Sequence, residues 1–197
     1  MKTYQVITAA TTYPVSLTEA KSHLKVDTTA DDTYIESIIK AATQLSEEYT
    51  NRFFIDTVIE QYASSFAELQ TLFKSKVSAV AHVKYYDSDN SLQTLSASVY
   101  DTQLNYEPSQ IQLADGQSFP TITKRNDAVL ARYTVGYGSA ASDVPEIIKQ
   151  AILLTIGNFY QNRASVVIGR IATELPQNVK WLLDTYKVQI VGWQLAN

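Results

Sequence analysis

The sequence has no cysteine, few glycines and prolines, and a modest share of charged residues. Among 197 residues there are no Cys, 6 Gly, 5 Pro and 2 His, and 18% are charged. The lack of Cys excludes disulfides, thiol catalysis and thiolate metal sites, and it fits a reducing compartment. Because 45% of the residues are hydrophobic, the chain can form a stable hydrophobic core without a bound metal. The length predicts a single domain over residues 1–197.

The charge balance and the hydrophobic runs argue against two further classes of protein. A formal net charge of −4 disfavours nonspecific binding to the DNA backbone, which depends on clustered Lys and Arg. The same net charge is compatible with a protein surface along which DNA slides without being bound specifically. Residues 1–12 lack the apolar core of a signal peptide. No apolar run approaches the roughly 20 residues that span a bilayer. We therefore expect a soluble protein without membrane contact.

The two histidines belong to no recognisable catalytic or metal-binding pattern. His23 falls in a predicted helix and His82 in a predicted strand, and two His without Cys make a zinc site improbable. Asp87–Ser91 resembles the start of a calcium loop, but Leu92 and Ser98 stand where that loop needs Gly and Glu. We predict a hairpin turn there. We predict no catalytic residue, no cofactor, no metal site and therefore no enzyme.

Helical periodicity and capping signals predict four helices, near residues 16–26, 31–51, 144–163 and 177–186. The first begins with Ser16 and Glu19 at capping-box spacing. The third is expected to have Asp143 as its N-cap and Pro145 in its first turn. The last helix carries the apolar residues Val179, Trp181, Leu182, Leu183 and Tyr186.

Between the second and third helices the pattern changes to that of strands. Runs at 58–62, 80–86 and 128–133 are rich in β-branched and aromatic residues. Without intervening helices, such strands pair antiparallel. We predict an α+β fold. Its helical bundle body is formed by residues 14–54 and 143–187, its antiparallel β-rich insert by 55–138, and its C-terminal tail by 188–197. Residues 1–13 are expected to form an edge strand or an extended arm.

Five phrases of the sequence follow one another in a familiar order. They are residues 15–27 (VSLTEAKSHLKVD), 31–35 (DDTYI), 49–52 (YTNR), 133–138 (YTVGYG) and 160–163 (YQNR). The pattern also includes residues 41–42 (AA), 144–145 (VP), 149–154 (KQAILL), and 175–176 (LP) leading to 182–183 (LL) and Tyr186. Together they resemble the head–tail connector, or adaptor, proteins of tailed bacteriophages. The insert makes the chain similar to the long variant of that family.

The resemblance implies a structural role without catalysis or cofactor. Connectors of this kind form a ring, commonly of twelve copies, which docks beneath the portal protein. The ring extends the DNA channel and gives stopper or tail-completion proteins a platform. The resemblance therefore implies a place at the head–tail junction of the virion, reached from the host cytoplasm during assembly. Two alternatives stay open. One is another stopper or tail-completion protein, and the other is a monomeric ligand-binding module that uses the insert, which holds seven of the 13 tyrosines.

Two sets of residues are candidate contacts in such a ring. The apolar end of the chain is predicted to face the portal or a neighbouring subunit through Tyr186, Val188, Ile190, Val191, Trp193 and Leu195. Arg163 and Arg170 flank an apolar loop and are candidate contacts with DNA or an acidic partner. For Arg163 we favour a different role, compensation of the carbonyl end of the third helix. The role of Arg170 stays open.

Overall fold

The computed structural model describes residues 3–74, 76–163 and 175–188 of the chain, and it contains two compact units. The sheet unit comprises Met1–Ala10, Asn51–Tyr137 and Val188–Asn197, and the helical unit comprises Thr11–Thr50 and Gly138–Lys187. The mixed α and β composition with an antiparallel sheet agrees with the sequence prediction. The expectation of one domain over the whole chain stays a prediction.

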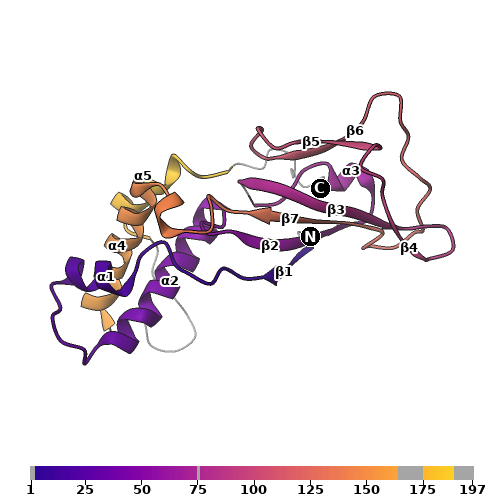
Figure 1. Cartoon of the computed structure of the whole chain (residues 1–197). Helices are drawn as coiled ribbons and strands as arrows, with labels where there is room; N and C mark the ends of the chain where they lie inside the picture. Colours follow the sequence, from indigo (N-terminus) through magenta and orange to yellow (C-terminus); the bar gives the residue numbers. More distant parts are fainter. Residues whose placement is uncertain (1–2, 75, 164–174, 189–197) are drawn as a thin grey trace, which may run out of the picture. The chain divides into compact units, whose positions relative to one another are not determined.

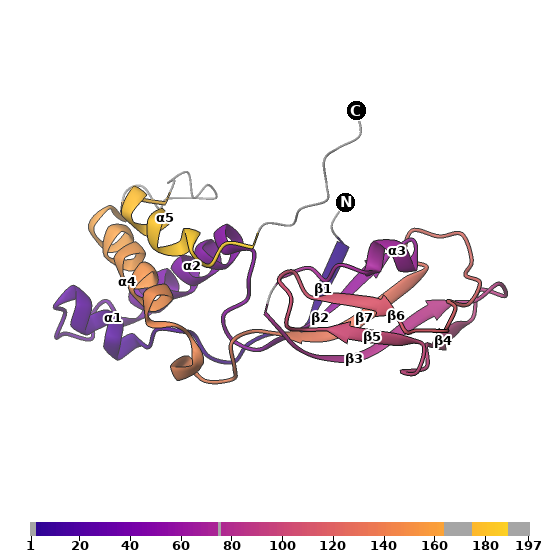
Figure 2. The ribbon, with the colours of Figure 1, turned by 90° about the horizontal axis from the view of Figure 1, so that it is seen from above.

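In the described part of the helical unit, residues 11–50, 138–163 and 175–187, there are four α-helices, whose bounds lie close to the predicted ones. They are α1 (Leu17–Leu24), α2 (Asp32–Thr50), α4 (Glu146–Gln161) and α5 (Gln177–Asp184). Helix α4 contacts the other three helices of the unit (Figure 2). Both α2 and α4 have buried apolar residues, namely Ile35, Ile38, Ile39, Ala42, Ile148, Ala151, Ile152 and Ile156.

The start of α1 has the capping geometry that the sequence predicts. The Glu19 amide donates to Ser16 Oγ at 3.2 Å, and the Ser16 amide donates to Glu19 Oε2 at 2.7 Å. These two bonds satisfy amides that a helix start leaves without intrahelical partners. The helix ends at Lys25, whose φ of 56° lies in the left-handed region.

The start of α4 differs from the prediction. Helix α4 begins at Glu146 with Pro145 as its N-cap, so the assignment of Asp143 as N-cap is wrong. Asp143 instead ends a 3-10 turn, η1 (Ala141–Asp143), and accepts a hydrogen bond from the Ala140 amide at 3.0 Å. The reason is steric, because a proline disfavours helical geometry in the residue before it. Val144 is accordingly extended, with φ −81° and ψ 130°.

The sheet unit is built on five antiparallel strands in the order β1-β2-β7-β3-β4 (Figure 1). Their bounds are Thr3–Thr8 (β1), Thr57–Ala63 (β2), Val129–Val135 (β7), Val77–Tyr86 (β3) and Leu92–Thr94 (β4). The N-terminal segment is thus an edge strand, one of its two predicted forms. The β3–β4 connection is the predicted hairpin turn, in which the Asp87 carboxylate accepts hydrogen bonds from the amides of Asp89 and Ser91.

A second layer packs on one face of this sheet. It consists of the short helix α3 (Phe66–Leu69) and a two-stranded ribbon of β5 (Tyr100–Gln103) and β6 (Gln110–Leu113). Backbone hydrogen bonds join the segment after α3 to this ribbon, from the Ile111 amide to the Gln70 carbonyl and from the Leu72 amide to the Ser109 carbonyl. The sheet and the second layer enclose one apolar core.

A polar network lies inside this core. Tyr133 and Gln61 are fully buried. The Tyr133 hydroxyl lies 2.6 Å from Gln61 Oε1 and 3.0 Å from the Phe73 carbonyl oxygen, and the Phe73 amide donates to Gln61 Oε1 at 2.8 Å. Gln61 Nε2 donates to the Thr71 carbonyl at 3.0 Å. The network attaches the segment after α3 to strands β2 and β7, and it satisfies polar groups that would otherwise be costly to bury.

Candidate assembly surfaces

The predicted contact residues fall partly inside the described structure. Tyr186 is half-buried, and Val188 is 9% exposed. The remaining predicted residues of the chain end (Ile190, Val191, Trp193 and Leu195) and Arg170 lie outside the described residues. The interface role of the whole set stays a prediction.

Arg163 lies just after α4 and forms a cluster with three residues of the helical unit. Its guanidinium donates to Asp31 Oδ2 at 2.7 Å and lies over the rings of Tyr34 and Tyr160, 4.7 and 4.5 Å from their centroids. The Tyr160 hydroxyl also donates to Asp31 Oδ2, at 2.6 Å. Hydrogen bonding from Arg163 lowers the pKa of Asp31, and hydrogen bonding to Asp31 raises the pKa of Tyr160. The cluster therefore joins the end of α4 to the start of α2.

Helix α5 places its tryptophan outward. Val179 and Leu183 are fully buried against the rest of the helical unit, whereas Trp181 is 67% exposed. In the sequence analysis Trp181 is grouped with the apolar residues of this helix, without a distinction between its buried and exposed faces. A helical projection separates them, because residues two positions apart point about 200° apart at 3.6 residues per turn. Trp181 is thus a large apolar side chain available for contact.

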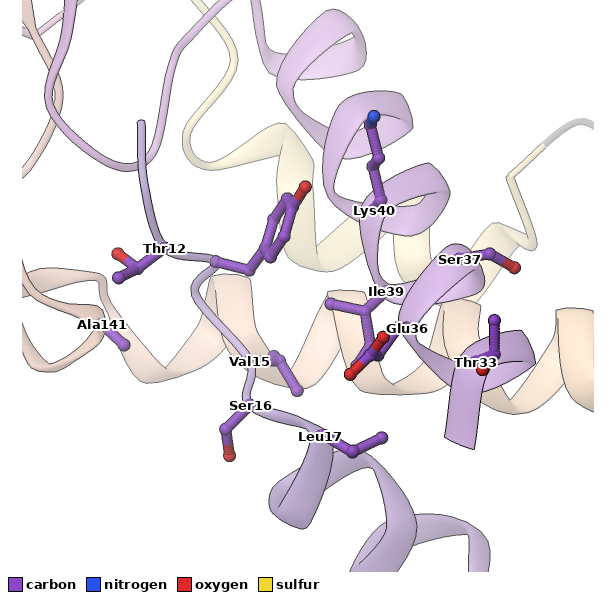
Figure 3. A pocket seen from close by; sticks show the side chains of 11 residues that line it. Thr12, Val15, Ser16, Leu17, Thr33, Glu36, Ser37, Ile39, Lys40 and Ala141 are labelled. Carbon is purple, nitrogen blue, oxygen red and sulfur yellow. The ribbon is translucent and has the colours of Figure 1, made fainter. Parts of the chain in front are cut away.

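A groove of about 640 Å³ lies on the first half of α2. The segment that leads into α1 forms its other wall, as Figure 3 shows, with Glu36 and Ile39 on the side of α2 toward that segment. Val15 and Ile39 are almost fully buried, and Tyr13 is 43% exposed. The full lining is Thr12, Tyr13, Val15, Ser16, Leu17, Thr33, Glu36, Ser37, Ile39, Lys40 and Ala141. Sequence reasoning missed this groove, because its walls come from segments that only the fold brings together.

Arg52 of the phrase at residues 49–52 and Tyr137 of the phrase at 133–138 lie close together in the sheet unit. Arg52 is 5% exposed. Its guanidinium binds the Glu107 carboxylate through both terminal nitrogens and lies 5.9 Å from the Tyr137 ring centroid. This pairing lowers the pKa of Glu107. At Gly136 the backbone passes so close that a Cβ would lie 2.6 Å from the Asp56 amide nitrogen. The ion pair with Glu107 therefore explains the arginine at position 52, and the close backbone approach explains the glycine at position 136.

The described residues contain no group of three or more His, Asp or Glu side chains placed to hold a metal ion. His23 belongs to the helical unit and His82 to the sheet unit. His82 stands opposite Arg132 in the β3–β7 pairing, and burial lowers its pKa. Among the helices of the described part of the chain, none is long and apolar enough to cross a bilayer.

The fold is similar to that of proteins in solved gene transfer agent (GTA) particles. A chain from the neck of an empty GTA particle, computed with C6 symmetry, matches with a TM-score of 0.75 and 18% identity over 97% of this chain and 98% of that one. A chain from the virion of a native GTA particle matches with a TM-score of 0.74 and 20% identity over 96% and 97%. A chain from the neck of a native GTA particle, computed with C12 symmetry, matches with a TM-score of 0.74 and 18% identity over 97% and 98%.

These likenesses define the fold class, and the family follows from the sequence itself. The family model described as phage gp6-like head-tail connector protein matches residues 14–115, which is more than half of the chain. The protein belongs to this family of structural connectors, and the resemblance seen in the sequence is confirmed. The comparison with curated proteins found no match.

Proposed function

We propose that the protein forms a ring of about twelve copies that docks beneath the portal, extends the DNA channel and gives stopper or tail-completion proteins a platform. The observation that carries this proposal is the match to the connector family over residues 14–115. The similar GTA structures support it, because the two neck structures were computed with C6 and C12 symmetry. A ring of this kind would place the protein at the head–tail junction of the virion, after assembly in the host cytoplasm.

The charge of the chain supports a channel through which DNA slides. A net charge of −4 gives the ring no overall attraction for phosphates, so DNA can pass without being held. No cofactor or catalytic step is part of this function. We also propose that the helices form the body of the ring and that the β-rich insert decorates it.

We propose that the end of the chain faces the portal. Tyr186, Val188 and the apolar residues at 190, 191, 193 and 195 would supply this contact, since aromatic and aliphatic side chains are common at the centres of interfaces. Arg163 and Arg170, which flank the loop, would contact DNA or an acidic partner. The cluster with Asp31 sets the position of Arg163.

The alternative of a monomeric ligand-binding module receives less support from the sheet unit. Several of its tyrosines pack in or against the hydrophobic core. Tyr133 is fully buried, and Tyr4, Tyr85 and Tyr100 pack against the core cluster. Tyr106, at 61% exposure, stands out as the accessible exception among the described tyrosines of this unit. The alternative of another stopper or tail-completion protein would also require a structural, non-catalytic subunit. The position of the ring relative to the portal distinguishes that alternative from a connector.

Native mass spectrometry tests the ring. The full chain is measured alone over a range of concentrations and then mixed with the portal protein of the same particle. We expect a closed oligomer of about twelve copies in at least one of the two conditions. A strict monomer in both would contradict the proposal.

A further inference from the structure

We propose that the groove on α2 receives Trp181 of the neighbouring copy, so that groove and tryptophan form the contact between subunits. This inference rests on the proposed ring. A closed ring of identical head-to-tail contacts requires two different and complementary surfaces on every copy. The helical unit carries both surfaces.

Trp181 has the properties of an interface anchor. It is 67% exposed, although burying an aromatic side chain of this size removes about 150–250 Å² of surface from water. Tryptophan is also enriched among the few residues that carry most of the binding energy of interfaces. Helix α5 holds it firmly, because the opposite side of the helix is anchored by the buried Val179 and Leu183.

The groove has the properties of a receptor for such an anchor. Its volume of about 640 Å³ falls in the range of about 300–1,000 Å³ typical of binding pockets. Val15 and Ile39 give it an apolar base, and the exposed Tyr13 offers a ring against which an indole can pack. Aromatic pairs of this kind add about 0.5–1.5 kcal/mol beyond the area that they bury.

The two surfaces are separated within one copy. The groove lies along Thr33–Lys40 of α2, whereas α5 packs near Leu45 and Tyr49. From Glu36 to Tyr49 the helix rises by about 20 Å at 1.5 Å per residue. Trp181 and the groove therefore serve two different neighbours, which is the arrangement that a head-to-tail ring requires.

Charged residues beside the two surfaces match as well. Glu36 and Lys40 are four residues apart at the groove, and Lys180 and Asp184 are four residues apart on α5. In a parallel alignment of the two helices, Glu36 would face Lys180, and Lys40 would face Asp184, whose Oδ1 already accepts a hydrogen bond from the Tyr49 hydroxyl at 2.6 Å. Exposed pairs of this type contribute little affinity, but they fix orientation and register. This complementarity selects a second copy of the chain as the occupant of the groove.

Crosslinking through engineered cysteines tests the contact, and the natural chain contains no cysteine that would interfere. The full-length double variant Tyr13→Cys/Trp181→Cys is treated with a short bismaleimide at a concentration at which native mass spectrometry shows that this variant itself is oligomeric. We expect a ladder of covalent oligomers up to the size of the ring. Each single-cysteine variant should stay monomeric on a denaturing gel. Dimers from either single variant, or no ladder from the double variant, would overturn the proposal.

A second measurement covers the case in which the cysteine variants assemble poorly. Trp181→Ala should raise the concentration for half-assembly at least about tenfold, which corresponds to about 1.4 kcal/mol. The matched control is Ile147→Ala, an exposed apolar side chain on α4 of the same unit. Glu36→Lys should also weaken assembly, and the added substitution Lys180→Glu should restore it. An unchanged Trp181→Ala ring overturns this contact and leaves the proposed function standing. A natural chain that forms no oligomer, alone or with the portal, contradicts both.

Discussion

At the residue scale, the sheet unit depends on polar side chains buried among apolar ones. Tyr133, Gln61 and the backbone at Phe73 exchange hydrogen bonds where water has no access. Such a network costs little when complete and much when one member is missing, because the group left behind has lost its water without gaining a partner. The polar atoms thus specify where the segment after α3 attaches.

Tyr133→Phe tests this network. The substitution removes the hydroxyl that bonds the Phe73 carbonyl and Gln61. Leaving a buried acceptor without its donor should lower the free energy of unfolding by about 1–3 kcal/mol. Urea unfolding of the full chain measures it. Tyr106→Phe, at an exposed position, is the control and should change little. Equal stability of both variants would show that the network is not needed.

Tyr62 should make the fold sensitive to alkaline pH. Burial, together with the hydrogen bond to Glu60, raises the pKa of Tyr62 from 10.0 to about 12. The folded pKa lies above the unfolded one, so the unfolded chain releases the proton first. The stabilisation is complete below pH 10 and is lost as the pH rises toward 12.

Comparison of the natural chain with Tyr62→Phe isolates this effect from that of other tyrosines. Both proteins are unfolded with urea at a series of pH values from 9 to about 12, a window set by the raised pKa. The natural chain should lose stability relative to the variant as the pH rises through this window. Parallel curves for the two proteins would contradict the assignment.

At the scale of elements, the sequence predicted what local signals determine. The helices α1 and α2 follow from a capping box at Ser16 and from Ile35, Ile38 and Ile39 at helical spacing. The antiparallel sheet follows from β-branched runs separated by turns. The predicted start of α4 was wrong because Asp143, a residue type common at N-caps, suggested an earlier start. The steric effect of Pro145 on Val144 excludes that start.

What the sequence did not predict arises from contacts between distant segments. The groove combines residues near 12–17 with residues near 33–40 and with Ala141. The network at Tyr133 joins strands β2 and β7 to a segment with no periodic signal. Trp181 is a different case, since its position on the helical projection separates it from Val179 and marks it as exposed.

Ser16→Ala tests the capping of α1. The substitution removes the side-chain acceptor for the Glu19 amide, and loss of such a cap costs about 1 kcal/mol. The thermal midpoint of the full chain should fall accordingly. Thr18→Ala changes an exposed residue of the same turn and serves as the control. A variant as stable as the control would mean that the cap does not limit the stability of the unit.

At the scale of the whole molecule, we infer that different parts of the protein make different contacts. We propose that the groove and Trp181 join copies to one another and that the end of the chain joins the ring to the portal. The first assignment follows from exposure and charge, and the second from the apolar sequence of the chain end.

Truncation after Val188 separates these assignments. The variant keeps the buried Val188 and lacks residues 189–197. Its affinity for the portal protein should fall at least about tenfold, while its unfolding midpoint and its ability to form rings should stay unchanged. Surface plasmon resonance and thermal unfolding measure these quantities. A truncated chain that unfolds would identify the end of the chain as part of the core rather than as a contact.

The most direct measurement is electron cryomicroscopy of the full chain bound to the portal protein of its own particle. We expect a closed ring of about twelve copies, coaxial with the portal channel and in direct contact with the portal, with Trp181 of each copy seated in the groove of the next. A portal that carries single copies without lateral contacts, or no copies, would contradict the central claim that this protein is a ring-forming connector.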